Sequence, residues 1–199
     1  MDAAFWNKRY ATDSHIYGES PNDFVAEMAG HIPAGPVLCL AEGEGRNAVH
    51  LATLGYQVTA VDHSEVGMAK ARRLAQLRGV KIETIVADLE HFAITPGAWS
   101  GIISIFAHLP PALRHRIHRA VVEGLRAGGI FILEAYTPAQ LAFDTGGPKE
   151  PERLMTAAGL REELSGVEFL TARELERDVV EGNGHSGRGA VVQVLARRN

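Results

Sequence analysis

Short apolar runs rich in β-branched residues alternate with amphipathic stretches through the first two thirds of the chain. This alternation is typical of β–α units that build a parallel sheet covered by helices. The run at residues 101–106 is almost continuously apolar, as expected for a central strand buried on both faces. The pattern predicts parallel strands over residues 37–41, 57–61, 80–86, 101–106 and 130–135.

Between these runs, apolar residues recur at helical spacing. Residues 46–54 form one amphipathic stretch, which Gly55 ends. Ser64 can cap the next helix, and Gly79 ends it. A Pro-Pro pair at 110–111 opens a third helix. Helices are therefore expected after the first, second and fourth of these strands.

The last third of the chain has a different pattern. Residues 167–180 and 189–196 are two strand-like runs, and a glycine-rich connection at 181–188 joins them as in a hairpin. We predict an α/β fold, namely a Rossmann-like, doubly wound, mostly parallel seven-stranded sheet with a C-terminal antiparallel hairpin. We expect one domain over residues 1–199, with an N-terminal segment at 1–30 and the core at 31–199.

Composition adds several restrictions to this picture. With 199 residues, 46% of them hydrophobic, the chain can bury one hydrophobic core without needing disulfides or a bound metal. Its formal net charge of −4 gives no general attraction to nucleic acid or anionic membranes. Its one cysteine, Cys39, has no partner for an intramolecular disulfide, and no stretch resembles a signal peptide or a membrane span. We expect a cytoplasmic protein with no metal site.

The most informative segment is the turn after the first strand. Residues 37–48 pass through a Gly-x-Gly turn, Gly43 and Gly45, straight into a helix whose first amides would face a ligand. Asp62 ends the second strand 19 residues after Gly43 (62 − 43 = 19). This is the spacing of an acid that accepts hydrogen bonds from ribose hydroxyls. Together these features predict a nucleotide-like ligand.

Three features favour S-adenosylmethionine over NAD as that ligand. Glu42 and Glu44 place carboxylates in the turn, where they would repel a pyrophosphate but attract an ammonium group. Asp88 follows the third strand, where a carboxylate can accept a hydrogen bond from an adenine amino group. Too little chain follows the sheet to form the separate substrate domain that is usual in dehydrogenases.

On these residues the chain resembles the class I methyltransferases, and within them the small tellurite-resistance and thiopurine-type group. The resemblance extends over nearly the whole chain, through segments 5–24, 40–47, 60–62, 87–88, 106–108 and 181–187. It implies S-adenosylmethionine as cofactor and a lid formed by residues 1–30. The cofactor-binding residues that we predict are Tyr17, Glu42, Gly43, Gly45, Arg46, Asn47, Asp62, His63, Ala87, Asp88, Leu89 and Phe106.

The chain departs from this group in its first strand. Many members have an acidic residue where this chain has Cys39, and a glycine where it has Ala41. The missing acid shifts recognition of the methionine ammonium group onto Glu42.

Aromatic side chains crowd the N-terminal segment of a chain that is only 7% aromatic. They could close over the cofactor, exclude water and face the sulfonium cation, or they could pack against the outer helices. Tyr17, beside the flexible Gly18, favours the first role. The aromatic residues are Phe5, Trp6, Tyr10, Tyr17 and Phe24.

Two histidines are candidate catalytic residues. His108 follows the fourth strand, where open α/β folds bind ligands, and could position the acceptor or remove its proton. His185 lies in the hairpin connection, which by the resemblance reaches the acceptor pocket. Capping, solvent-exposed and simple turn roles remain open for them. The basic run 114–119 is interpreted as a solvated helix face, with a nucleic-acid footprint as the alternative.

We predict methyl transfer from S-adenosylmethionine to a small-molecule acceptor, such as a thiol, selenium or tellurium species. Such a nucleophile ionises readily and needs no general base, which agrees with the lack of a clear base in the sequence. The alternatives are an RNA, tRNA or protein methyltransferase, a non-catalytic S-adenosylmethionine-binding module and an NAD-dependent enzyme. The acceptor and the oligomeric state stay open.

Overall fold

The computed structural model describes residues 2–143, 145–182 and 184–199, and for His185 only the backbone. The strands are β1 (Pro36–Leu40), β2 (Gln57–Asp62), β3 (Glu83–Val86), β4 (Trp99–Ile105), β5 (Leu125–Tyr136), β6 (Val167–Glu181) and β7 (His185–Arg198). Within the described residues they form a seven-stranded sheet in the order β3-β2-β1-β4-β5-β7-β6. Pairing is parallel from β3 to β5, whereas β7 runs antiparallel to both β5 and β6.

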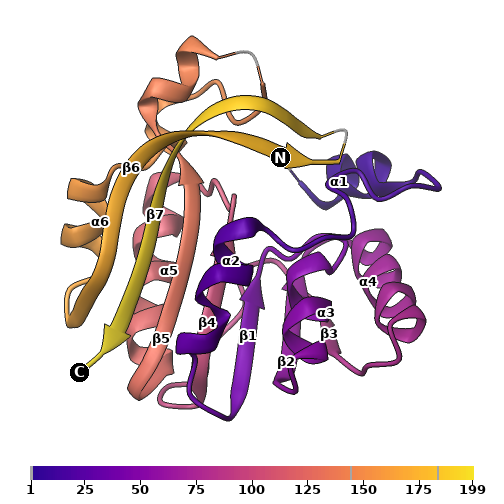
Figure 1. Cartoon of the computed structure of the whole chain (residues 1–199), viewed down its shortest axis with the longest axis horizontal. Helices are drawn as coiled ribbons and strands as arrows, with labels where there is room; N and C mark the ends of the chain where they lie inside the picture. Colours follow the sequence, from indigo (N-terminus) through magenta and orange to yellow (C-terminus); the bar gives the residue numbers. More distant parts are fainter. Residues whose placement is uncertain (1, 144, 183) are drawn as a thin grey trace.

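Helices cover both faces of this sheet (Figure 1). The helices are α1 (Ala3–Tyr10), α2 (Asp23–Met28), α3 (Arg46–Thr53), α4 (Glu65–Leu77), α5 (Pro111–Gly124) and α6 (Ala157–Glu163), with 3-10 turns η1 (Ala29–His31), η2 (Pro138–Ala142) and η3 (Pro151–Arg153). α2, α3 and α4 pack on Val37 and Cys39, whereas α5 and α6 belong to the cluster of Leu38 and Leu40. Neighbouring residues of β1 thus face opposite layers, which explains why this strand is apolar throughout. Of the described helices, none is long and apolar enough to cross a membrane.

The predicted fold is confirmed, and two parallel strands begin three or more residues away from their predicted starts. β3 is shorter than residues 80–86, since its ladder with β2 begins only at Glu83. β5 begins before the Gly-Gly pair, because Leu125 already pairs with Trp99. The next pair joins Gly101 to Ile130, so residues 126–129 are an irregular part of the strand.

The hairpin connection is much shorter than the predicted residues 181–188. Glu181 pairs with His185, and the ladder continues to Val167 opposite Arg198. The glycines beyond His185 do not interrupt it, because a residue without a Cβ can still adopt extended backbone. The long hairpin arches over the parallel strands and brings its tip beside the N-terminal segment (Figure 1).

Candidate active site

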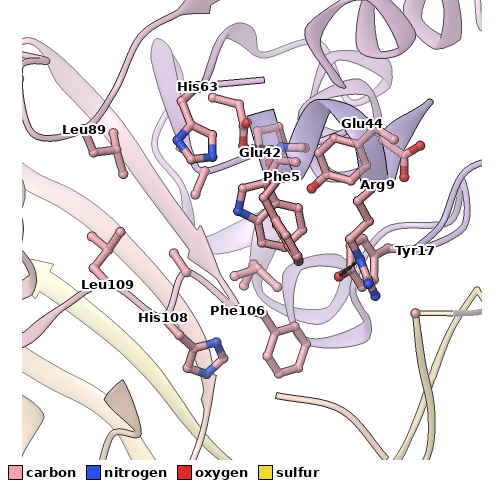
Figure 2. A pocket seen from close by; sticks show the side chains of 18 of the residues that line it. Phe5, Arg9, Tyr17, Glu42, Glu44, His63, Leu89, Phe106, His108 and Leu109 are labelled. Atoms are coloured by element: carbon pink, nitrogen blue, oxygen red, sulfur yellow. Dashed lines mark hydrogen bonds between the residues drawn. The ribbon is translucent and has the colours of Figure 1, made fainter. Parts of the chain in front are cut away.

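A cavity of about 510 Å³ lies at the carboxyl ends of β1, β2 and β4, bordered by the N-terminal segment and the hairpin tip. Open α/β sheets bind ligands at this edge. Figure 2 shows Glu42 and His63 towards one end of the cavity and Phe106 and His108 towards the other, with Phe5 between them. The predicted residues that line it are Tyr17, Glu42, Gly43, Arg46, Asn47, Asp62, His63, Ala87, Asp88, Leu89, Phe106 and His108.

The turn between β1 and α3 has left-handed backbone. Gly43 and Gly45 have φ angles of 61° and 91°, and Ala41, although not a glycine, has a φ of 50°. Phe106, at the end of β4, has a φ of 52° and lines the same cavity. Non-glycine residues rarely adopt this conformation, and such strain clusters at functional sites.

Gly45 has a packing role, which differs from its predicted contact with the cofactor. A Cβ on Gly45 would lie 2.4 Å from the Cβ of Ala71 in α4. The missing side chain therefore lets α3 begin directly against α4. As far as the described residues define the cavity, Gly45 lies outside its lining.

Glu42 is a buried carboxyl in the lining of the cavity, with 8% of its surface exposed. Its Oε1 accepts a hydrogen bond of 2.8 Å from the backbone N–H of Ala48, in the first turn of α3. Burial raises the pKa of Glu42 to about 7, although the Ala48 N–H and the charge of Arg46 oppose this shift. An ammonium group in the cavity would favour the ionised form, because opposite charges attract strongly where water is excluded.

Glu44 also lines the cavity, but its charge is already paired within the protein. Its Oε1 pairs with Nζ of Lys70 at 2.7 Å, and its Oε2 accepts a hydrogen bond of 2.8 Å from the N–H of Ile16. The charge of Glu44 is thus already neutralised. Its carboxylate fastens the N-terminal segment to the turn and to α4.

Asp62 holds the glycine turn and the start of α4 together. Its Oδ2 accepts a hydrogen bond of 2.9 Å from the N–H of Gly43, and its Oδ1 accepts one of 2.8 Å from the N–H of Ser64. Burial raises the pKa of Asp62, while these two N–H groups lower it. Each oxygen keeps a further lone pair, so the carboxylate can still receive ribose hydroxyls.

The predicted adenine-binding residues lie beyond β3. The backbone N–H of Ala87 donates to the carbonyl of Asp62 at 3.0 Å, which joins this segment to the end of β2. Asp88 is exposed, and its Oδ1 accepts a hydrogen bond of 2.8 Å from the N–H of Glu90. Leu89 is buried and supplies an apolar wall.

Four of the five N-terminal aromatic residues line the cavity, so the two expected roles are divided among them. Trp6 and Tyr10 stack with their ring centroids 5.4 Å apart. The hydroxyl of Tyr17 accepts a hydrogen bond of 3.1 Å from Nε of Arg9. Phe24 is 1% exposed and belongs to the core beneath α2, so it has the packing role.

The two candidate catalytic histidines differ in what the structure says of them. Nε2 of His108 accepts a hydrogen bond of 3.0 Å from the backbone N–H of Tyr136, and the two rings stack at 5.6 Å. This geometry favours positioning over proton removal through Nε2. His185 begins β7 instead of lying in a loop, and its side chain lies outside the described part of the chain. Among the described residues, no group of three or more His, Cys, Asp or Glu side chains could hold a metal ion.

Sequence reasoning missed two arginines in the lining. Arg9 comes from α1, and Arg153 comes from η3. Nη1 of Arg153 lies 3.4 Å from the carbonyl oxygen of His108. Among the described residues, the carboxylate within 4 Å of the Arg153 guanidinium is that of Glu150, whose Oε1 lies 3.9 Å from Nε. The segment 146–148 also lines the cavity. Arg153 and residues 146–148 lie in segments without a motif, so their position after β5 was their only signal. Arg9 lies within segment 5–24, which the resemblance includes.

The basic run 114–119 is not a single solvated helix face. Arg114 and His118 are buried, and both contact Glu163 of α6, at 2.9 Å and 2.6 Å. Burial would raise the pKa of Glu163, but the hydrogen bonds from His118 and Arg114 lower it to about 2. The nucleic-acid alternative therefore loses Arg114 as a phosphate contact.

Residues 37–129 match the model of a methyltransferase domain family. A probable S-adenosylmethionine-dependent methyltransferase, TehB of Haemophilus influenzae, is 33% identical over 85 residues, which cover 43% of this chain and 28% of that protein. The crystal structure of TehB from Haemophilus influenzae has a TM-score of 0.73 at 24% identity, over 99% of this chain and 67% of that one. A structure described for the conversion of a disulfide bond into a thioacetal group during echinomycin biosynthesis has a TM-score of 0.78 at 21% identity, over 100% and 90%.

Over residues 37–129 the chain is therefore similar to the class I S-adenosylmethionine-dependent methyltransferases, and its sheet order and glycine turn agree with this similarity. Among these proteins it is similar to TehB in sequence and in fold. The family implies S-adenosylmethionine as the cofactor. The segments matched by sequence span only 28% to 43% of the length of three such relatives.

Proposed function

We propose that this chain binds S-adenosylmethionine in the cavity and transfers its methyl group to a small acceptor, namely a thiol, selenium or tellurium species. One observation carries the proposal. Glu42, Asp62 and Asp88 lie at or just beyond the carboxyl ends of three adjacent strands, β1, β2 and β3, and all three line the cavity. Their order suits the ammonium, ribose and adenine parts of this cofactor.

The residues present fit this cofactor better than they fit NAD. A pyrophosphate at the turn would meet the buried carboxyls of Glu42 and Asp62. The nearby guanidinium of Arg46 is already paired with Glu181 at 2.7 Å. An ammonium group would instead gain a counter-charge in Glu42.

The bound cofactor supplies a methyl group that is already activated by the sulfonium charge. The task of the protein is then to align the acceptor and exclude water. Phe5, Tyr17 and Phe106 line the cavity and offer apolar walls and ring faces near a cation. The backbone of Tyr136 fixes the His108 ring, which keeps this end of the cavity in one shape.

Two arginines support an anionic acceptor. Among the described residues, Arg9 interacts with the hydroxyl and the ring of Tyr17 rather than with a carboxylate. Arg153 lies beside His108 and has Glu150 only at 3.9 Å. A guanidinium group that has no close carboxylate partner attracts anions such as a thiolate, a selenolate or a metalloid oxyanion. Such an acceptor arrives ionised and requires no base from the protein.

Calorimetry with S-adenosylmethionine and S-adenosylhomocysteine tests the first half of the proposal, with NAD as the control ligand. We expect binding of the first two compounds and none of NAD. Formation of S-adenosylhomocysteine is then followed with 4-mercaptobenzoate, selenite and tellurite, and with neutral amines and phenols for comparison. Binding of NAD alone, or no product with any acceptor, would overturn the proposal.

A matched pair of variants tests the anionic acceptor. Arg153→Gln removes one guanidinium from the cavity, whereas Arg119→Gln removes one outside its lining. A lost charged hydrogen bond costs about 1.5–3 kcal/mol, so KM for an anionic acceptor should rise at least about tenfold in Arg153→Gln. Affinity for S-adenosylhomocysteine should not change in either variant. Equal KM values in the two variants would argue against the anionic site.

A further inference from the structure

The carboxylate of Glu181 joins three segments that border the cavity. Glu181 ends β6 and is 5% exposed. Its Oε2 accepts a hydrogen bond of 2.7 Å from Nη2 of Arg46, and its Oε1 accepts one of 2.8 Å from Nδ2 of Asn22. Arg46 begins α3 at the glycine turn, and Asn22 caps α2 at the end of the N-terminal segment. Hairpin, turn and N-terminal segment therefore meet at one buried group.

Two further charged residues, Arg177 and Glu134, continue the ion-pair network beyond Glu181. Arg177 lies 3.8 Å from its Oε1 and donates a hydrogen bond of 2.8 Å to Glu134 of β5. Glu134 is fully buried and also accepts a hydrogen bond of 3.2 Å from Gln193. The charges alternate from Arg46 through Glu181 and Arg177 to Glu134. Removal of Glu181 leaves the buried guanidinium of Arg46 without the carboxylate that it pairs with, which is costly for a buried charge.

The same elements fix the turn at residues 16–18, which carries Tyr17 into the cavity. Nη1 of Arg46 lies 3.4 Å from the carbonyl oxygen of Tyr17, and the N–H of Gly184 donates to the carbonyl of Ile16 at 2.8 Å. A Cβ on Gly182 would lie 2.4 Å from that Ile16 oxygen, so the hairpin tip and the turn touch through bare backbone. The position of Tyr17 thus depends on Arg46 and on the hairpin tip.

We propose that Glu181 is a positioning residue that couples cofactor binding at the glycine turn to closure of the hairpin and the N-terminal segment over the cavity. Glu181 acts through Arg46 and Asn22. A ligand that restricts the motion of the glycine turn also restricts Arg46. Through the ion pair between Arg46 and Glu181, this restriction extends to the hairpin tip and to Tyr17. The inference rests on the proposed function only in that it takes S-adenosylhomocysteine as the ligand of the turn.

Amide hydrogen exchange with and without saturating S-adenosylhomocysteine tests this coupling. In the wild type, the ligand should slow exchange at the glycine turn (residues 42–48), at residues 12–18 and at residues 184–190. In Glu181→Gln, the glycine turn should still be protected, while the other two segments lose their ligand-induced protection and affinity falls about tenfold. Glu176→Gln is the matched control, because Glu176 lies on the same strand but forms an exposed pair with Arg188. It should behave as the wild type.

The outcomes separate this inference from the proposed function. No heat and no protection with the wild type would refute S-adenosylhomocysteine as the ligand. Binding with unchanged protection at residues 12–18 and 184–190 in Glu181→Gln would refute the coupling alone. Should Glu181→Gln fail to fold, Arg46→Gln breaks the same ion pair from the other side, and retained protection there would equally refute it. In the double variant, the loss of affinity should match that of one single variant, whereas additive losses would show independent roles.

Discussion

Glu42 should release a proton when the amino-acid end of the cofactor binds. Burial holds the pKa of its carboxyl at about 7 in the free protein, with Arg46 lowering and Asp62 raising it. A bound ammonium group favours the ionised form, so the pKa falls in the complex. At pH 6 about nine tenths of Glu42 is protonated before binding, and nearly one proton is released per ligand.

The expected magnitude follows from the ionised fraction of Glu42. This fraction is about 0.03 at pH 5.5 and about 0.8 at pH 7.5 for a pKa of about 7. If binding requires the carboxylate, apparent affinity for S-adenosylhomocysteine rises about 25-fold over this range. The gain flattens above pH 7.5, where Glu42 is mostly ionised already.

Calorimetry in pairs of buffers with different ionisation enthalpies measures the protons released directly. 5′-Methylthioadenosine, which lacks the amino-acid part, is the control ligand and should bind with little pH dependence. Glu42→Gln should bind S-adenosylhomocysteine weakly, with a flat pH profile. Proton uptake by the wild type, or a 25-fold pH dependence (about the ratio of the two ionised fractions) retained in Glu42→Gln, would refute this account of the site.

Stability measurements by urea unfolding test the packing and the charges. Gly45 and Gly55 share a φ of 91°, but an added Cβ would meet Ala71 only at Gly45. Gly55→Ala should therefore lower the free energy of unfolding by about 1 kcal/mol, and Gly45→Ala by about 3 kcal/mol. Equal losses in the two variants would contradict the packing role. Glu163→Gln should lower the free energy of unfolding by about 3 kcal/mol. The pKa of Glu163 is lowered to about 2 in the folded state, so wild-type stability should fall as pH drops below about 4.5. The variant should lack this pH-dependent loss. Glu42 has the opposite sign: its raised pKa makes it a source of stability at low pH that is lost as pH rises through 7, and Glu42→Gln should remove this slope.

The sheet could be predicted because its signals are local. Each apolar run contains a strand of the sheet, and helical patterns follow the first, second and fourth runs. Ser64 caps α4 as expected, accepting a hydrogen bond from the N–H of Gly67. The hairpin limits were wrong because glycine content was interpreted as a break, whereas backbone pairing across the tip decides where strands end. Pairing partners are not visible in one segment alone.

The site was predictable only where its residues follow strands directly. Glu42, Asp62 and Asp88 line the cavity because strand ends place them there. Glu44 also lines the cavity, but its charge is paired with Lys70, 26 residues away, which no spacing rule couples to the turn. Arg153 likewise reaches the cavity through a tertiary contact that the sequence does not encode locally.

The position of β7 in the sheet has a consequence for how the chain folds. β7 follows the other strands in sequence, yet it lies between β5 and β6. Until β7 docks, β5 keeps an unpaired edge and β6 has no neighbour in the sheet, so both remain open to wrong partners during synthesis. The ion pair between Arg46 and Glu181, which spans 135 residues, belongs to the hairpin that this step adds to the sheet. A chain interrupted before residue 185 would therefore lack β7 and leave β6 without a place in the sheet. It would also lack the paired hairpin whose tip borders the cavity.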